Sequence, residues 1–302
     1  MPAMRIDERL ADGGPCFSFE FFPPKTDQGE RNLGRALAEL SRLDPAFVSV
    51  TYGAGGTTEQ KAKTVDIVSH IKADYGLEAM AHFTCVGATT EDLRATLDHM
   101  RKSGIQNVLA LRGDPPLGQE EWTATDGGLS YSRELIELIR AEYEFAIGAA
   151  CFPETHIHAE SPESDLRYCK EKVDAGARFL ITQLFFDNAV YYDFVARTRD
   201  IGVDVPIIPG IMPITDLGQI KRFTSMCGAT IPDVLLRELE LRADAPEAVA
   251  ELGVAYATLQ CADLLANGAP GIHFYTLNKS HSTRAILGAL RAMAPWRQRV
   301  AA

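Results

Sequence analysis

A glutamate inside an aromatic run near the N-terminus is the first residue of this chain that is suited to chemistry. The run, FSFEFFPP at residues 17–24, is rich in strand-forming residues and closes with two prolines, which predicts a buried strand that stops sharply. Period-two alternation puts Ser18, Glu20 and Phe22 on one face of that strand. Burying an ionised carboxylate among aromatic rings is costly, which favours the protonated form and suits a general acid. A structural carboxylate satisfied by a buried Arg or Lys explains the same residues equally well.

Two further motifs have weaker chemical meaning. His156 and His158 form a His-x-His pair that can present two ligands to a metal ion. The pair falls in a predicted loop without a matching carboxylate or cysteine set, so we favour ordinary ligand contacts and expect no metal. The loop at 53–56 (GAGG) precedes a predicted helix, where backbone N–H groups can approach a phosphate. It matches neither the dinucleotide-binding nor the Walker fingerprint.

One predicted helix carries a polar stripe. Asp165, Tyr168 and Lys172 are spaced to share one face, away from the apolar residues of the same segment. From the pattern alone, a solvent-facing surface explains this stripe better than a binding site does.

Composition and charge exclude several classes of partner. The chain has 302 residues, of which 46% are hydrophobic, and a formal net charge of -11. This charge disfavours nucleic acid and anionic membranes, which need a basic surface. The six cysteines include no Cys-x-x-Cys pair and predict free thiols in a reducing cytoplasm. The first fifteen residues lack the apolar core of a signal peptide, and we expect no membrane-spanning stretch.

Strands and helices are predicted to alternate along the whole chain. After the strand within 17–24, the predicted strands are 47–52, 78–85, 107–112, 145–152, 179–186, 206–212 and 271–277. The predicted helices are 32–42, 57–75, one beginning at 90, 131–142, 165–175, 188–200, 216–226, 232–242, 246–266 and one beginning near 282. This order predicts a parallel sheet closed as a single α/β domain, a (β/α)8 barrel, with extra helices between strands seven and eight. Residues 1–14 are expected to form an N-terminal tail, and a doubly wound open sheet is the alternative fold.

Polar residues stand at the C-terminal ends of the predicted strands, where the active sites of such barrels lie. They are Glu20, Thr51, His82, Arg112, Asp114, Gln183 and Asn278. Each has a structural explanation by itself, but their convergence exceeds what core packing requires. We therefore expect a small-molecule site at this end of the barrel.

The motifs together identify a family resemblance that covers nearly the whole chain. They are FSFEFFPP (17–24), VSVTYGA (48–54), HFTC (82–85), ALRGD (110–114), KVDAGA (172–177), ITQ (181–183), FFD (185–187), IPGI (208–211) and HFYTLN (273–278). In these motifs the chain resembles the bacterial 5,10-methylenetetrahydrofolate reductases. The resemblance implies a barrel that binds FAD non-covalently and reduces 5,10-methylenetetrahydrofolate to 5-methyltetrahydrofolate. NADH or NADPH would reduce the flavin first and leave before the folate enters, and the choice between the two nucleotides stays open.

The resemblance also implies roles for individual residues. Glu20 would be the general acid that helps to open the imidazolidine ring, and Asp114 would contact the pterin and tune the flavin. The implied cofactor-binding residues are Thr51 for nicotinamide and, for FAD, Tyr52, Ala54, His82, Arg112, Gly113, Asp114, Tyr131, Phe152, His156, Ala159, Asp165, Tyr168 and Lys172. The implied folate-binding residues are Asp114, Gln183, Gln219, Phe223 and Lys279.

Three positions depart from the family pattern. Phe152 stands where some relatives have Tyr, and Glu171 replaces a basic residue. Lys279 replaces Arg, so a folate carboxylate would meet a point charge rather than a bidentate fork. The alternatives to the flavin enzyme are direct hydride transfer from NAD(P)H to the same folate without flavin, and a folate-binding subunit that needs a partner. A homo-oligomer is expected.

Overall fold

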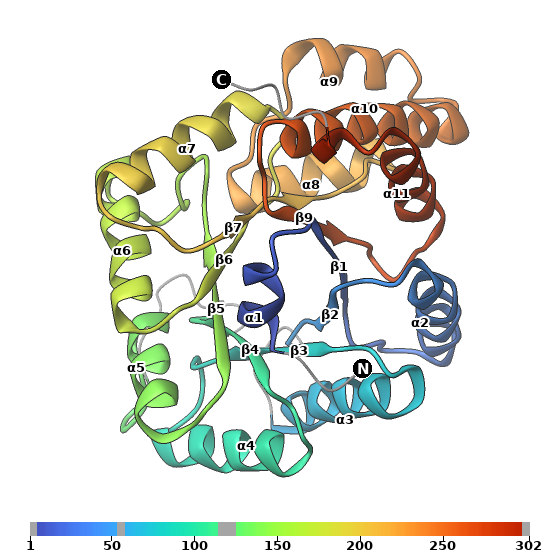
Figure 1. Cartoon of the computed structure of the whole chain (residues 1–302). Coiled ribbons are helices and arrows are strands. Elements are labelled where there is room, and N and C mark those ends of the chain that lie inside the picture. Colours follow the sequence, from blue (N-terminus) through green and yellow to red (C-terminus); the bar gives the residue numbers. More distant parts are fainter. Residues whose placement is uncertain (1–4, 53–57, 114–124, 298–302) are drawn as a thin grey trace.

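A ring of parallel strands forms the centre of the molecule (Figure 1). The computed structural model describes residues 5–52, 58–113 and 125–297, with the backbone alone at 58–62. The strands are β1 (Cys16–Phe21), β2 (Phe47–Val50), β3 (Ala79–Thr84), β4 (Asn107–Leu111), β5 (Ala146–Cys151), β6 (Phe179–Thr182), β7 (Ile207–Ile208), β8 (Gly210–Ile211) and β9 (Gly271–Tyr275). Their order is β7-β6-β5-β4-β3-β2-β1-β9-β8, and every pairing between these strands is parallel.

The barrel closes through a strand that Pro209 interrupts. β6 pairs with β7 on one side of this proline, and β9 pairs with β8 on the other. Proline has no N–H to donate to a sheet, but the Pro209 carbonyl accepts a hydrogen bond from His273 N at 2.9 Å. β7 and β8 therefore act as one seventh strand, and the predicted (β/α)8 barrel is confirmed.

Helices surround the barrel and join its strands (Figure 1). They are α2 (Asp27–Leu40), α3 (Thr58–Tyr75), α4 (Thr90–Lys102), α5 (Ser132–Glu142), α6 (Pro162–Ala175), α7 (Asn188–Asp200), α8 (Leu217–Cys227), α9 (Asp233–Glu240), α10 (Pro246–Ala266) and α11 (His281–Met293), with 3-10 turns at Ser41–Leu43 and Pro295–Arg297. Three helices, α8, α9 and α10, lie between the last two barrel strands where a regular barrel has one, so extra helices are present there as predicted.

Two helices begin earlier than the apolar spacing predicted. α2 begins at Asp27 rather than residue 32, because the Thr26 hydroxyl accepts a hydrogen bond from Gly29 N at 3.1 Å. α6 begins at Pro162 rather than residue 165, because Ser161 caps it and Pro162 fits the first helical turn. In both helices capping fixes the start, and the apolar stripe begins only further along the chain.

A short helix closes the N-terminal end of the barrel. α1 (Ile6–Ala11) lies across the barrel in Figure 1, within the segment that sequence analysis described only as a tail. Ile6 is fully buried against Phe47, Met80 and Phe179 in the cluster that fills this end. Its backbone N–H donates to Asn107 Oδ1 at 2.9 Å. The opposite, C-terminal end of the strands is left for the site.

Helix α10 corrects one expectation. An 18-residue window within its 21 residues has a mean hydropathy of 1.2, so it is long and apolar enough by composition to cross a membrane. No such stretch was expected from the sequence. In the structure one side of α10 is buried, including Val249, Ala257 and Leu264, and the helix packs against α11. This packing is typical of a helix in the outer layer of a barrel.

Candidate functional site

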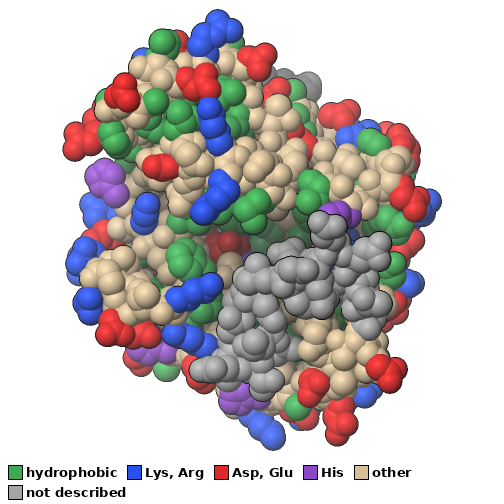
Figure 2. All heavy atoms as spheres, turned by 180° about the vertical axis from the view of Figure 1, so that it is seen from behind, with side chains coloured by type: hydrophobic (Ala, Val, Ile, Leu, Met, Phe, Trp, Pro, Cys, Tyr) green, Lys and Arg blue, Asp and Glu red, His purple; other side chains and the backbone are tan. Residues whose placement is uncertain are grey.

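A cavity of about 620 Å³ opens at the C-terminal ends of the strands. Its walls come from β1, β3, β4, β5, β6 and β9, the loops that follow them, and helix α8. Figure 2 looks at the face opposite to that of Figure 1 and shows a hollow with hydrophobic side chains at its edge and an acidic side chain inside it. A volume of this size suits a small organic molecule.

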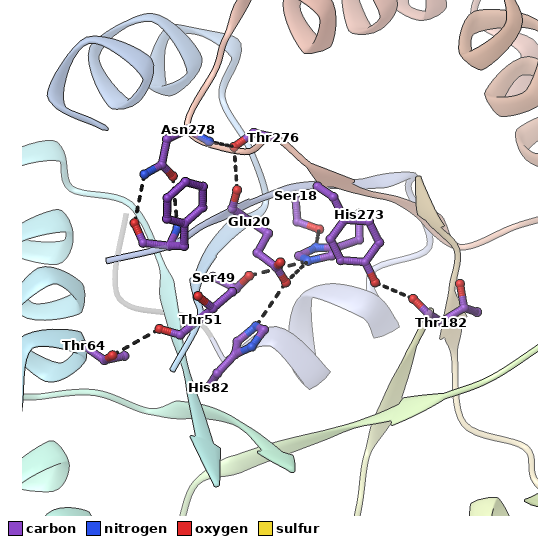
Figure 3. Close-up of polar contacts among 12 residues, drawn as sticks. Ser18, Glu20, Ser49, Thr51, Thr64, His82, Thr182, His273, Thr276 and Asn278 are labelled. Carbon is purple, nitrogen blue, oxygen red and sulfur yellow. Dashed lines mark hydrogen bonds and ion pairs between the residues drawn. The ribbon is translucent and has the colours of Figure 1, made fainter. Parts of the chain in front are cut away.

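Glu20 lies in this cavity between two histidines. Its side chain is 18% exposed, and Oε2 lies 3.3 Å from His82 Nε2 and 3.4 Å from His273 Nε2 (Figure 3). β1 and β9 position it, with Glu20 in register with Tyr275. Among the residues that the structure describes, no Arg or Lys forms a salt bridge with Glu20. The alternative of a carboxylate neutralised by a buried cation therefore has no support there.

His82 is held in its neutral form. Burial lowers the pKa of this imidazole to about 4, the neighbouring His273 lowers it further, and the Glu20 carboxylate opposes the shift only in part. Its Nε2 atom is buried and has no hydrogen-bond partner within the described chain. A neutral ring with an unused nitrogen in a cavity wall is suited to a hydrogen bond with a bound molecule.

Thr84, two residues further along β3, also has a buried polar atom without a hydrogen-bond partner in the described chain. The residue is buried and lines the cavity, and its hydroxyl makes no hydrogen bond to the rest of the described chain. Thr84 was not predicted as a site residue, although period-two alternation from His82 puts it on the same face of the strand.

Asn278 has a structural role rather than a place in the cavity wall. Its Oδ1 accepts from Phe22 N at 3.0 Å, and its Nδ2 donates to Phe22 O at 2.9 Å. Next to it, the Thr276 hydroxyl donates to the Glu20 carbonyl at 2.5 Å. The final motif of the sequence, HFYTLN, therefore fixes the backbone on both sides of Phe21, where β1 ends (Figure 3).

The loop after β4 approaches the cavity closely at Gly113. Its φ of +92° favours glycine, and a Cβ atom there would lie 2.4 Å from Val86 Cγ1. Arg112 lines the cavity beside it, and its Nε donates to the Gly113 carbonyl at 3.3 Å. A side chain at position 113 would thus push into the wall formed by the β3–α4 loop.

The His-x-His pair forms a local turn. The His158 backbone N–H donates to His156 Nδ1 at 3.1 Å, and His156 N donates to Asp165 Oδ2 at 3.1 Å. Burial raises the pKa of Asp165, while the His156 N–H and the charge of Lys172 oppose that shift. In the described parts of the chain, no group of three or more His, Cys, Asp and Glu side chains is placed to hold a metal ion.

Lys172 faces the barrel rather than the open surface. Its ammonium donates to the Ala150 carbonyl at 2.7 Å and lies 5.7 Å from the centre of the Phe152 ring. Lys172 is buried and does not line the cavity, whereas the Phe152 ring that it faces does. Glu171, next to it, lies 3.8 Å from Arg133 and points to the surface network of α5 and α6.

The structure brings together many of the predicted site residues. Those that line the cavity are Glu20, Thr51, Tyr52, His82, Arg112, Gly113, Phe152, His156, Gln183 and Phe223. Those that do not line it are Tyr131, Ala159, Asp165, Tyr168, Lys172, Gln219 and Lys279. Ala54 and Asp114 lie outside the described residues. Besides Thr84, the lining includes Phe22, Ile157, Met226 and Tyr275, which sequence reasoning had not assigned to the site.

The fold and the cavity define a (β/α)8-barrel protein with a cavity of small-molecule size at the C-terminal ends of its strands. Residues 5–291 match the family model described as methylenetetrahydrofolate reductase. The chain belongs to this family, as its motifs predicted.

Individual relatives agree with this assignment. The chain is 38% identical over 287 residues to the 5,10-methylenetetrahydrofolate reductase of Escherichia coli, covering 94% of each protein. It is 40% identical to methylenetetrahydrofolate reductase (NADH) 1 of Arabidopsis thaliana, covering 97% of this chain but 52% of the plant protein. It therefore spans about half the length of such plant relatives. An uncharacterized Clostridium thermocellum protein that binds two copies of 5-methyl-5,6,7,8-tetrahydrofolic acid shares the fold, with a TM-score of 0.64 at 14% identity over 95% of this chain and 98% of that one.

Proposed function

We propose that this protein reduces 5,10-methylenetetrahydrofolate to 5-methyltetrahydrofolate with electrons from NADH or NADPH, carried by bound FAD. The observation that carries the proposal is Glu20, a carboxyl group in an open cavity with two histidines and no Arg or Lys as partners in the described chain. Family membership over residues 5–291 supports the choice of substrate.

Glu20 would act as the general acid of the folate half of the reaction. Opening the five-membered imidazolidine ring breaks a carbon–nitrogen bond, and the leaving nitrogen needs a proton. A carboxyl group in a partly water-excluded pocket is suited to deliver it. The ring carbon then becomes an iminium carbon that can accept a hydride.

The residues present fit a flavin. His82 Nε2 and Thr84 Oγ1 are buried polar atoms in the cavity wall without hydrogen-bond partners in the described chain, and a polar heteroaromatic ring would satisfy both. Arg112 and His156 line the same cavity and would donate hydrogen bonds to a diphosphate. Because the chain has a net charge of -11, such donors must be provided locally at the site. When bound, FAD supplies an acceptor and donor of hydride between the two substrates.

Nicotinamide and folate would use the same surface in turn. Thr51, Gln183 and Phe223, the residues proposed to contact them, line one cavity. Two planar substrates that need the same wall cannot bind together. A ping-pong order, in which NAD⁺ leaves before the folate enters, follows from this shared occupancy.

Location and assembly are part of the proposal. The six cysteines are all free, and five of them are buried, which suits a reducing cytoplasm. A homo-oligomer remains our expectation from sequence.

A visible spectrum of the purified protein tests the proposal most directly. We expect flavin absorption, and release of FAD on denaturation. A colourless protein that takes up no FAD but still reduces the folate with NAD(P)H would favour direct hydride transfer. A protein that binds folate but reduces none would favour the subunit alternative.

A further inference from the structure

A buried chain of polar side chains runs from Glu20 into the barrel (Figure 3). Behind the carboxyl group lies His273 of β9, which is completely buried, with its ring stacked on Phe47 at 5.9 Å between centroids. His273 Nε2 lies 3.4 Å from Glu20 Oε2, and Nδ1 lies 2.8 Å from Ser18 Oγ. The parallel register explains the arrangement, because Ser18 pairs with His273 and precedes Glu20 by one period on the same face of β1.

We propose that Ser18 and His273 are positioning residues: Ser18 holds the His273 ring in the tautomer protonated at Nε2, and this N–H fixes which Glu20 oxygen carries the transferable proton. The proposal rests on the proposed function, in which Glu20 is the general acid.

The tautomer follows from the hydrogen bonds that each atom can make. Within the described chain, the buried Ser18 hydroxyl has His273 Nδ1 as its hydrogen-bond partner. If Nδ1–H donated to this oxygen, the hydroxyl hydrogen would be buried without an acceptor. Ser18 therefore donates to Nδ1. A neutral imidazole that accepts at Nδ1 carries its proton on Nε2, which faces Glu20.

The second serine near the ring does not reverse this argument. Ser49 Oγ lies 3.5 Å from His273 Nε2, at the outer limit of a hydrogen bond, whereas the Ser18 contact is 2.8 Å. The shorter bond decides the tautomer, and Ser49 can share the Nε2–H with Glu20. From the other side, His82 Nε2 lies 3.3 Å from the same Glu20 oxygen without forming a hydrogen bond.

This arrangement leaves the transferable proton of Glu20 on its other carboxyl oxygen. An N–H group that donates to Oε2 prevents that oxygen from carrying a proton, so the proton of the Glu20 carboxyl group lies on Oε1. In the reaction the Oε1–H bond breaks, its electron pair stays on the carboxylate, and an N–H bond forms on the folate. His273 does not give up its own proton in this step, and its N–H stabilises the negative charge that develops on Glu20.

Nitrogen NMR of the protein labelled with ¹⁵N-histidine measures the tautomer without any substrate. The His273 signals are assigned by their loss in His273→Gln. We expect an unprotonated Nδ1 and a protonated Nε2 in wild type and in Ser49→Ala, and a shift toward the other tautomer in Ser18→Ala. A protonated Nδ1 in wild type would overturn the proposal.

Half-reaction kinetics test the consequence. In Ser18→Ala we expect reoxidation of the reduced flavin by methylenetetrahydrofolate to slow about tenfold, the size of one lost hydrogen bond to a developing charge. Flavin reduction by NADH should stay close to wild type. His273→Gln retains an N–H donor and should be faster than His273→Leu in the folate half-reaction.

The outcomes separate this proposal from the proposed function. A folate half-reaction that is unchanged in Ser18→Ala, or equally slow in His273→Gln and His273→Leu, would contradict the positioning role. A wild-type protein that reduces no folate would overturn the proposed function instead, while the NMR measurement still reports the tautomer. If Ser18→Ala does not fold, the wild-type spectrum alone decides the tautomer.

Discussion

Glu20 Oε2 lies 3.3 Å from Nε2 of His82, a histidine whose pKa burial lowers to about 4. At neutral pH the carboxyl group therefore has a neutral imidazole beside it. A protonated imidazole there would hold Glu20 as a carboxylate, which has no proton to give. The relationship between these two residues thus bears on both catalysis and stability.

Replacing Glu20 should affect only one half of the proposed reaction. Glu20→Gln keeps the shape and a hydrogen-bond donor but removes the transferable proton. We expect near-normal flavin reduction by NAD(P)H and a folate half-reaction slowed by about 10²- to 10⁴-fold, the usual contribution of a positioned general acid. Stopped-flow absorbance of the two half-reactions measures both effects.

The exposed Glu247→Gln on α10 is the control for loss of a carboxylate, and it should change neither half-reaction. If Glu20→Gln slows both halves equally, Glu20 holds the site together. If it slows neither, the acid lies elsewhere, and Asp114 is the next residue to test.

His82 should make the protein less stable in weak acid. Because its pKa falls from 6.5 to about 4 on folding, the unfolded chain binds more protons between these values. This contribution is fully present above pH 6.5 and is lost as the pH falls toward 4. The contribution of His82 to the free energy of unfolding is about 3 kcal/mol in full, because each unit of the pKa difference between the unfolded and folded protein corresponds to about 1.36 kcal/mol. Urea unfolding at a series of pH values measures it.

His82→Gln should flatten the dependence of the unfolding free energy on pH between 4 and 6.5. His281→Gln, at an exposed position on α11, is the matched control and should leave the slope unchanged. An unchanged slope in His82→Gln would show that His82 is not neutral in the folded protein.

Shared use of the cavity predicts a kinetic pattern. If nicotinamide and folate both need the surface of Thr51, Gln183 and Phe223, the two substrates cannot be bound together. Steady-state rates measured against both substrates should then give parallel double-reciprocal lines. Intersecting lines, the sign of a ternary complex, would rule out successive use of one surface.

Gly113 should be intolerant of a side chain. Gly113→Ala adds a Cβ at 2.4 Å from Val86 Cγ1 and also forces alanine to a φ of +92°. Gly104→Ala is the control, since φ is +73° there but no atom lies within 4 Å of the new Cβ. We expect Gly104→Ala to cost about 1 kcal/mol of unfolding free energy and Gly113→Ala a further 1–3 kcal/mol, roughly, from overpacking. Thermal and urea unfolding measure both, and equal losses would contradict the clash.

The sequence determined the barrel and much of the cavity wall. Strands alternating with helices specify a parallel sheet, because each strand needs a crossover helix to reach its neighbour, and the count of eight strands favoured a closed barrel over an open sheet. Once the barrel is known, the C-terminal ends of the strands must meet, so Glu20, His82, Arg112 and Gln183 were predictable as neighbours. These predictions depend only on period and order along the chain.

The tertiary structure alone decided what surrounds Glu20. His273 lies more than two hundred residues away in sequence, and only barrel closure between β1 and β9 brings it to 3.4 Å from the carboxyl group. Asn278 was predicted at the site on position alone, yet its amide is used by the Phe22 backbone. Ile157 and Met226 line the cavity but could not be predicted there, because an apolar residue in a sequence is assigned to the hydrophobic core unless its neighbours are known. Period fixes the face of a strand on which a residue lies, whereas the partner that it meets there depends on contacts between segments far apart in the chain.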